Sequence, residues 1–180
     1  MLLPVVTGYH GCGQDTYEKV TQHNAPMKES SNDYDWLGSG VYFWQDSEAR
    51  AWIWANECKS RGSIKDIAVI KASIDLRNCL DLLQEQYREE LKQVYKLMKL
   101  EYELSKKPLP INMSKLHNLD CAVINHLHQF RKKTGDPPYD TVRAVFQEGN
   151  SVYPGSRIME KDHIQIAVRS QGCITVQRSL

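Results

Sequence analysis

Several features that would place the chain in a special class are missing from its sequence. No stretch approaches the ~18 consecutive apolar residues of a membrane-spanning helix, and the opening MLLPVVTGYHGCG turns polar too soon for a signal peptide. Charge of one sign is also lacking, because 23 Lys and Arg stand against 22 Asp and Glu and leave a formal net charge of +1. A basic nucleic-acid-binding arm and an acidic disordered tail are therefore excluded.

Paired cysteines are missing as well. Five cysteines stand at positions 12, 58, 79, 121 and 173, and none forms a CxxC pair. An odd, scattered set without an export signal predicts reduced thiols and a cytoplasmic location. The overall composition is that of an ordinary globular protein, since 41% of the 180 residues are hydrophobic and 25% are charged. This predicts one soluble domain over residues 1–180 with its own core.

Hydrophobic spacing predicts strands towards both ends of the chain and helices in the middle. Apolar residues three and four positions apart predict a long helix from Leu80 to Tyr102 and a second from Leu116 to Phe130. A shorter helix is predicted at 47–56, and strands are predicted at 41–44, 66–74, 141–146, 163–169 and 173–176. Helices inside a β frame indicate an α+β fold instead of βαβ winding.

Two glycine-rich clusters could carry chemistry. In GYHGCG at 8–13, three glycines let the backbone approach a ligand closely, and His10 supplies a neutral donor and acceptor suited to a sugar hydroxyl. In YDWLGSGVYFW at 34–44, glycines flank a tight loop and Tyr42 keeps a polar tip among aromatic residues. Alone, the first is also compatible with an ordinary turn and the second with a core strand.

A third cluster lies on the late strand HIQIAVR. One of its faces carries His163, Gln165 and Arg169, which a fully buried strand would not place together. A half-exposed strand with one face in contact with solvent explains the same pattern. The segment before it, 147–162, is long for a loop in a compact domain, and long loops tend to be functional.

A metal site and a cysteine nucleophile are the generic alternatives. His117, Cys121 and His128 would share one side of a helix, but no fourth ligand is evident, so no metal is expected. Cys12 stands close to His10, yet neighbours in a turn do not provide nucleophile–base geometry by themselves.

The order of the three clusters resembles the ADP-ribosyltransferases of the diphtheria-toxin and poly(ADP-ribose) polymerase class, which is named for a His-Tyr-Glu triad. His10-Gly11 resembles its His-Gly element, and GSGVYF at 38–43 resembles the Gly-Lys-Gly-Ile-Tyr-Phe segment of the polymerases. YDWLGSGVYFW, LDCAVINHLH, PPYDTVRAVFQEG and HIQIAVR look most like small bacterial toxins of toxin–antitoxin and phage-defence systems. The resemblance implies a split-sheet transferase core with a helical insertion at about 80–133.

The resemblance also implies roles for individual residues. His10 would bind the adenosine ribose of NAD, the Gly11 backbone would hold the nicotinamide carboxamide, and Tyr42 would stack on the nicotinamide ring. Arg50 or Arg143 would contact the diphosphate, although each is also compatible with an ordinary surface ion pair. The residues implied to bind NAD, which is a co-substrate, are therefore His10, Gly11, Gly40, Tyr42, Arg50 and Arg143.

The third triad position departs from the family, because Gln165 stands where the family has Glu. An amide can hydrogen-bond ribose hydroxyls but brings no negative charge to the transition state. Three interpretations follow. Gln165 suffices for single transfers, or the acid comes from the preceding loop as Glu148 or Glu160, or the fold only binds. Glu148 is the preferred substitute because VFQEG ends a strand and opens that loop.

The expected function is that of an NAD-dependent mono-ADP-ribosyltransferase, a toxin that modifies a macromolecule and releases nicotinamide. An NAD hydrolase and a non-catalytic NAD or ADP-ribose binding module are the alternatives. The acceptor is open between RNA or DNA and protein. Between Gln84 and Lys133, ten Lys and Arg against six acids leave a local excess of +4, which could seat nucleic-acid phosphates or be a solvated helix face. A free toxin would also need an antitoxin partner.

Overall fold

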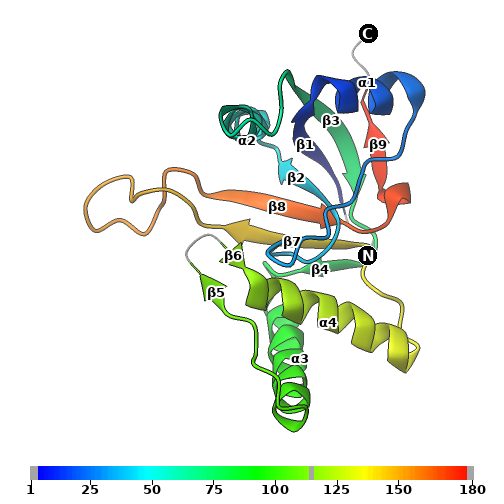
Figure 1. The fold of residues 1–180 in the computed structure, drawn as a ribbon, viewed down its shortest axis with the longest axis vertical. Helices are drawn as coiled ribbons and strands as arrows, with labels where there is room; N and C mark the ends of the chain where they lie inside the picture. The colour runs from blue at the N-terminus through cyan, green and yellow to red at the C-terminus, as the bar shows by residue number, and fades with distance from the viewer. Residues whose placement is uncertain (1–3, 114–115, 178–180) are drawn as a thin grey trace.

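The computed structural model describes residues 4–113 and 116–177, which build a mostly antiparallel sheet between two groups of helices (Figure 1). Its strand order is β4-β7-β8-β2-β1-β3-β9, and β4 and β7 are the neighbours that run parallel. These strands are β1 (Val5–Gly13), β2 (Val41–Gln45), β3 (Ile67–Asp75), β4 (Cys79–Asp81), β7 (Thr141–Phe146), β8 (His163–Val168) and β9 (Ile174–Val176). The predicted α+β class is confirmed.

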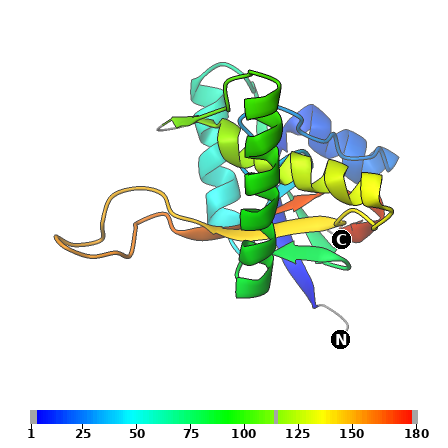
Figure 2. The ribbon, with the colours of Figure 1, turned by 90° about the horizontal axis from the view of Figure 1, so that it is seen from below.

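The helices cover the sheet from two sides. Helix α1 (Gln14–His23) and α2 (Glu48–Ser60) pack on β1 and β3, whereas α3 (Glu85–Leu104) and α4 (Asn118–Thr134) pack on each other at the β4–β7 end (Figures 1 and 2). A two-stranded ribbon of β5 (Asn112–Met113) and β6 (Leu116–His117) joins α3 to α4. A single 3₁₀ turn, Gln171–Cys173, precedes β9. None of the described helices is long and apolar enough to cross a membrane.

The core is divided between the two faces of the sheet. Along β8, Ile166 and Val168 belong to the cluster under α1, while Ala167 between them belongs to the cluster under α3 and α4. Side chains of successive strand residues point to opposite faces, so one strand contributes to both clusters. Each cluster removes apolar area from water, which is the main favourable term in folding. The two clusters therefore pack against β8 and its neighbours from both faces of the sheet and hold them in place.

The long helix predicted from Leu80 begins later than expected, at Glu85. Leu80 is fully buried in β4, which pairs with β7 from Cys79↔Thr141 to Asp81↔Arg143. The start of that prediction was wrong because an apolar residue at helical spacing satisfies a strand equally well. Helix α1 was not predicted, since Val20 and Thr21 are its buried residues and make no apolar stripe.

Between β7 and β8 the chain forms a hairpin that projects away from the rest of the molecule (Figures 1 and 2). We call residues 147–162 the projecting segment. Its base is tied by backbone hydrogen bonds from Lys161 N–H to Glu148 C=O at 3.0 Å and from Glu160 N–H to Asn150 C=O at 2.9 Å. Gly149, with φ of +92°, supplies a left-handed conformation that most residues avoid. The segment thus extends the β7–β8 pair instead of crossing the sheet.

Candidate functional site

The first candidate site is a cavity where β1 and β2 separate. It has a volume of about 720 Å³, and we call it the inner cavity. The pairing of β1 with β2 covers Gly8↔Gln45 and Tyr9↔Trp44, while β2 continues along β8 through Tyr42↔Ala167 and Val41↔Val168. Five of the predicted site residues line this space. His10 and Gly11 belong to β1, Tyr42 to β2 and Gln165 to β8, and Gly40 directly precedes β2.

His10 sits at the point where the two strands part. Its Nδ1 lies 2.8 Å from the carbonyl oxygen of Tyr42. A carbonyl oxygen only accepts, so Nδ1 carries the proton and Nε2 keeps a lone pair. Burial lowers the pKa of His10, and the bond to Tyr42 opposes this effect only in part. His10 is therefore a neutral ring that can accept a hydrogen bond from a ligand hydroxyl.

Two glycines that border the inner cavity allow close contacts between backbone segments. A Cβ atom at Gly11 would lie 2.5 Å from the Ala51 carbonyl oxygen, and one at Gly40 would lie 2.9 Å from the Val168 carbonyl oxygen. Helix α2 could not sit so near β1 with any larger residue at position 11. The glycines are thus required by packing, and their backbones border the cavity.

The Tyr42 hydroxyl is fully engaged by the loop before β2. It accepts a hydrogen bond from Leu37 N–H at 3.0 Å and donates one to Gly38 C=O at 2.7 Å. Burial raises the pKa of Tyr42 well above its ordinary value, and the nearby Asp35 carboxylate adds to the effect, so the hydroxyl stays protonated. The ring of Tyr42 is what remains to meet a ligand.

Gln165 is held by a residue that the sequence pattern did not single out. Trp36 donates its Nε1–H to Gln165 Oε1 at 2.6 Å and also lines the inner cavity. With its oxygen occupied, Gln165 has its amide N–H groups left to donate. The Trp36 ring packs on Phe146 with 4.8 Å between centroids, which fixes its direction. No local sequence signal reveals this contact, because its partners are 129 positions apart.

A carboxylate also lines the inner cavity. Asp35 accepts hydrogen bonds from Ser30 Oγ at 2.6 Å and from Asn32 N–H at 2.8 Å. These bonds are typical of a side chain that organises its own turn. Asp35 therefore shapes the loop that carries Trp36 and places a negative charge at the edge of the cavity.

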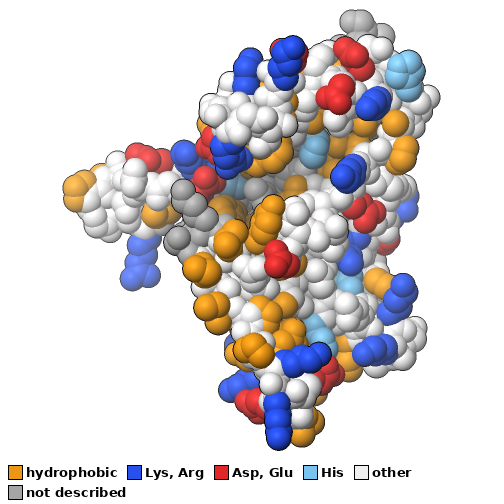
Figure 3. All heavy atoms as spheres, in the orientation of Figure 1, with side chains coloured by type: hydrophobic (Ala, Val, Ile, Leu, Met, Phe, Trp, Pro, Cys, Tyr) orange, Lys and Arg blue, Asp and Glu red, His pale blue; other side chains and the backbone are white. Residues whose placement is uncertain are grey.

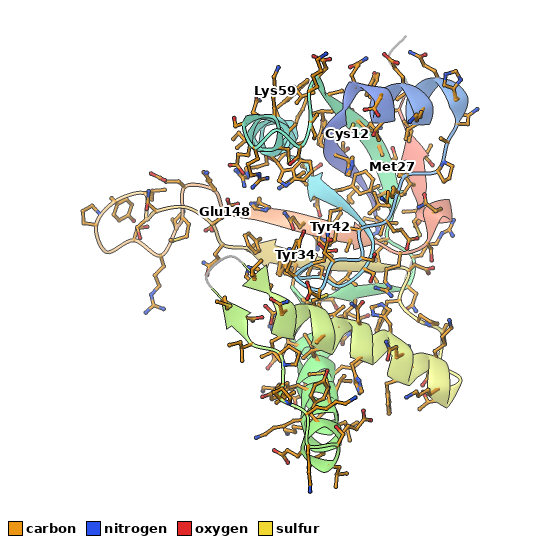
Figure 4. The ribbon with its side chains drawn as sticks, in the orientation of Figure 1. Cys12, Met27, Tyr34, Tyr42, Lys59 and Glu148 are labelled. Atoms are coloured by element: carbon orange, nitrogen blue, oxygen red, sulfur yellow. The ribbon has the colours of Figure 1, made fainter. Side chains whose placement is uncertain are left out.

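A second cavity, of about 1090 Å³, adjoins the first, and we call it the outer cavity. Trp44, Trp54, Arg61 and Gln165 line both. Arg50 of α2 and Glu148 of the projecting segment face the outer cavity, where they form an ion pair. Figure 4 shows Glu148 at the base of the projecting segment and Tyr42 near the centre of the sheet. The preferred substitute acid and a predicted diphosphate ligand thus lie beside the inner cavity, not in it.

Arg143 and Glu160 are not brought to either cavity. The Arg143 guanidinium donates to Gln45 Oε1 at 2.7 Å and lies 3.1 Å from an Asp81 carboxylate oxygen, which ties β7 to β2 and β4. Glu160 is exposed and accepts a hydrogen bond from Asn150 N–H at 3.3 Å within the projecting segment. Both side chains serve local structure.

The generic alternatives find little support in the geometry. Burial raises the pKa of the Cys12 thiol to about 11, so it is protonated at neutral pH and a poor nucleophile. His128 is buried with Nδ1 on the Ile124 carbonyl, and Cys121 lies against the Asn32 carbonyl. Within residues 4–113 and 116–177, no three His, Cys, Asp or Glu side chains gather into a group that could hold a metal ion.

Comparison with known proteins finds a distant relative. No protein-family model matches the chain. The uncharacterized protein MJ0359 of Methanocaldococcus jannaschii is 28% identical over 147 residues, which covers 78% of this chain and 64% of that protein. The chain thus spans less than two thirds of the length of that protein.

Proposed function

We propose that the protein is an NAD-dependent mono-ADP-ribosyltransferase that modifies a macromolecule and releases nicotinamide. One observation carries this proposal: three residues matched to a His-Tyr-Glu triad by their sequence context, His10, Tyr42 and Gln165, come from three neighbouring strands and line the same cavity. Sequence distance alone gives no reason for the three to meet. Their convergence is what a single dinucleotide site requires.

The inner cavity offers a partner for the adenosine ribose of NAD and for each part of its nicotinamide half. His10 Nε2 accepts a hydrogen bond from an adenosine ribose hydroxyl, and the Gly11 backbone borders the place for the carboxamide. The Tyr42 ring stacks on the nicotinamide, and Gln165 donates its amide N–H groups to the nicotinamide ribose. Holding both ends of the scissile bond supplies orientation, which accounts for a large part of the rate in such reactions.

The reaction breaks the bond between C1′ of the ribose and the nicotinamide nitrogen. The electron pair of that bond goes to the nicotinamide ring, and C1′ passes through an oxocarbenium-like state, as in glycoside hydrolysis. Gln165 orients the sugar without adding charge. The Asp35 carboxylate lines the inner cavity, and the carboxylates of Glu57 and Glu148 line the outer cavity beside it.

A non-catalytic NAD or ADP-ribose binding module is the second candidate. Two observations favour it. An amide replaces the family's carboxylate at position 165, and the Tyr42 hydroxyl is hydrogen-bonded to the backbone of the loop at 37–38. The same pocket with water as acceptor would make an NAD hydrolase. The toxin role and the need for an antitoxin remain part of the proposal, and growth arrest on expression in a bacterial host tests them.

The test uses NAD labelled separately in nicotinamide and in adenylate phosphate. Incubation with a cell extract should release nicotinamide and transfer phosphate label to a macromolecule, and His10→Ala should reduce both at least about tenfold. Lys132→Ala, on the exposed side of α4, is the matched control and should change neither. Free ADP-ribose without labelled acceptor would favour the hydrolase, and NAD binding without nicotinamide release would favour the binding module. Absence of both binding and release would refute the proposal.

A further inference from the structure

The outer cavity has the chemistry of a recognition site that the NAD assignment leaves unused. Arg50, Arg61 and Lys161 bring positive charge to its wall, and Trp54 and Phe146 bring flat aromatic surface. Figure 3 shows charged side chains of both signs gathered where the projecting segment joins the body of the molecule. The outer cavity adjoins the inner one, because Trp44, Trp54, Arg61 and Gln165 line both. A molecule in it would therefore lie next to the proposed NAD ribose.

The carboxylates of this wall are already neutralised, which leaves a net positive surface. Glu148 pairs with Arg50, and Glu57 of α2 lies 3.9 Å from Lys161 Nζ. These two ion pairs also fasten both ends of the projecting segment to α2. Arg61 has no carboxylate within 4.0 Å among the described residues, and its Nη2 lies 3.3 Å from Cys58 Sγ. Its charge is available to a ligand anion.

Arg50 retains unused donor capacity. Its Nη2 meets Glu148, but its Nε and Nη1 are buried and have no hydrogen-bond partner within the part of the chain that the structure describes. Buried guanidinium N–H groups without acceptors are costly. Planar guanidinium groups bind phosphate oxygens in pairs, so a phosphate drawn into the cavity would relieve that cost.

We propose that the outer cavity is the acceptor site and that it takes a nucleotide of a single-stranded nucleic acid. This inference rests on the proposed transferase function. Aromatic faces that stack on bases, next to cations that meet the backbone, are the combination that binds single strands without a duplex. The base stacks on Trp54, and the flanking phosphates meet Arg61 and Lys161. The bases of a duplex are hidden in the stack and cannot make the first contact.

Glu148 then has a chemical role at the acceptor. Its Oε2 bonds to Arg50, which leaves Oε1 able to accept a proton. A nitrogen or oxygen of the nucleotide forms the new bond to C1′, the C1′–nicotinamide bond breaks, and nicotinamide leaves with the electron pair of that bond. The proton of the attacking group goes to Glu148, so the step balances without another reactant.

The experiment measures binding of a fluorescein-labelled single-stranded RNA of about 12 nucleotides, a length within the site sizes of single-strand binders. DNA of the same sequence and the corresponding duplex form the other arms. The double variant Arg61→Gln/Lys161→Gln should raise the Kd for the single strand about tenfold or more and flatten its salt dependence, because about two phosphate contacts are lost. Lys132→Gln/Lys133→Gln removes the same charge from α4 and should leave the Kd unchanged. Trp54→Ala should weaken binding by a similar factor.

Separate readouts keep this inference apart from the transferase proposal. Nicotinamide release by the wild-type protein reports the NAD site, and thermal unfolding reports whether each variant is folded. Release of nicotinamide with label on protein but no binding of single strands would overturn the acceptor assignment and leave the transferase standing. Loss of binding in the α4 variant instead of the cavity variant would also overturn it. No nicotinamide release under any condition would refute the transferase itself. RNA and DNA arms that differ would show which single strand is preferred.

Discussion

Removing one hydroxyl, in Tyr42→Phe, should destabilise the fold without removing the ring that lines the inner cavity. The hydroxyl pairs with Leu37 N–H at 3.0 Å and Gly38 C=O at 2.7 Å, and both residues are buried. Each buried backbone group left without a partner costs about 1–3 kcal/mol. Part of that cost is recovered by relaxation of the loop, so we expect a loss of about 2–4 kcal/mol in the free energy of unfolding.

Urea unfolding followed by tryptophan fluorescence measures this loss. With a slope of about 2 kcal/mol/M, the midpoint should fall by about 1–2 M while the slope stays unchanged. Tyr34→Phe is the matched control, because Tyr34 is 45% exposed, lines the same cavity and should change stability by less than about 0.5 kcal/mol. Equal midpoints for the two variants would refute the view that this hydroxyl holds the loop.

Three further predictions concern the cavity and the core. Gln165→Glu should raise nicotinamide release about tenfold or more, because a carboxylate stabilises the developing positive charge; an unchanged or lower rate speaks against an oxocarbenium centre at this position. Gly11→Ala should cost about 1–3 kcal/mol in urea unfolding, since its Cβ would meet the Ala51 carbonyl oxygen at 2.5 Å, whereas Gly13→Ala meets an exposed side chain first and should be nearly neutral. Burial, aided by the charge of Arg169, lowers the pKa of His128 to about 4, so stability is lost as pH falls below 6.5. Between pH 7 and pH 5 the wild type should lose about 2 kcal/mol more than His128→Leu, and parallel pH profiles would contradict this.

The predictable part of the fold consists of features that neighbouring residues determine. The alternation of HIQIAVR and the run TVRAVF predicted β8 and β7 at their observed positions, because strand periodicity is a property of consecutive residues. The start of α3 was misplaced at Leu80, and α1 was missed, because a short or ambiguous apolar pattern fits more than one element. The second glycine cluster also marked the loop before β2 that borders the inner cavity, whereas the first cluster lies within β1.

The site shows the same division. The sequence by itself placed Tyr42 and Gln165 on strands, and its resemblance to the His-Tyr-Glu class predicted that they share a site with His10. All three residues line one cavity. It could not show that Trp36 donates a hydrogen bond to Gln165 or that Arg50 pairs with Glu148 in a second cavity. Nor could it show that Arg143 forms an ion pair with Asp81 of a neighbouring strand. These contacts join residues 62 to 129 positions apart. Local periodicity carries no information about such pairs, because which distant side chains meet is decided when the strands take their order in the sheet and the helices pack against its two faces.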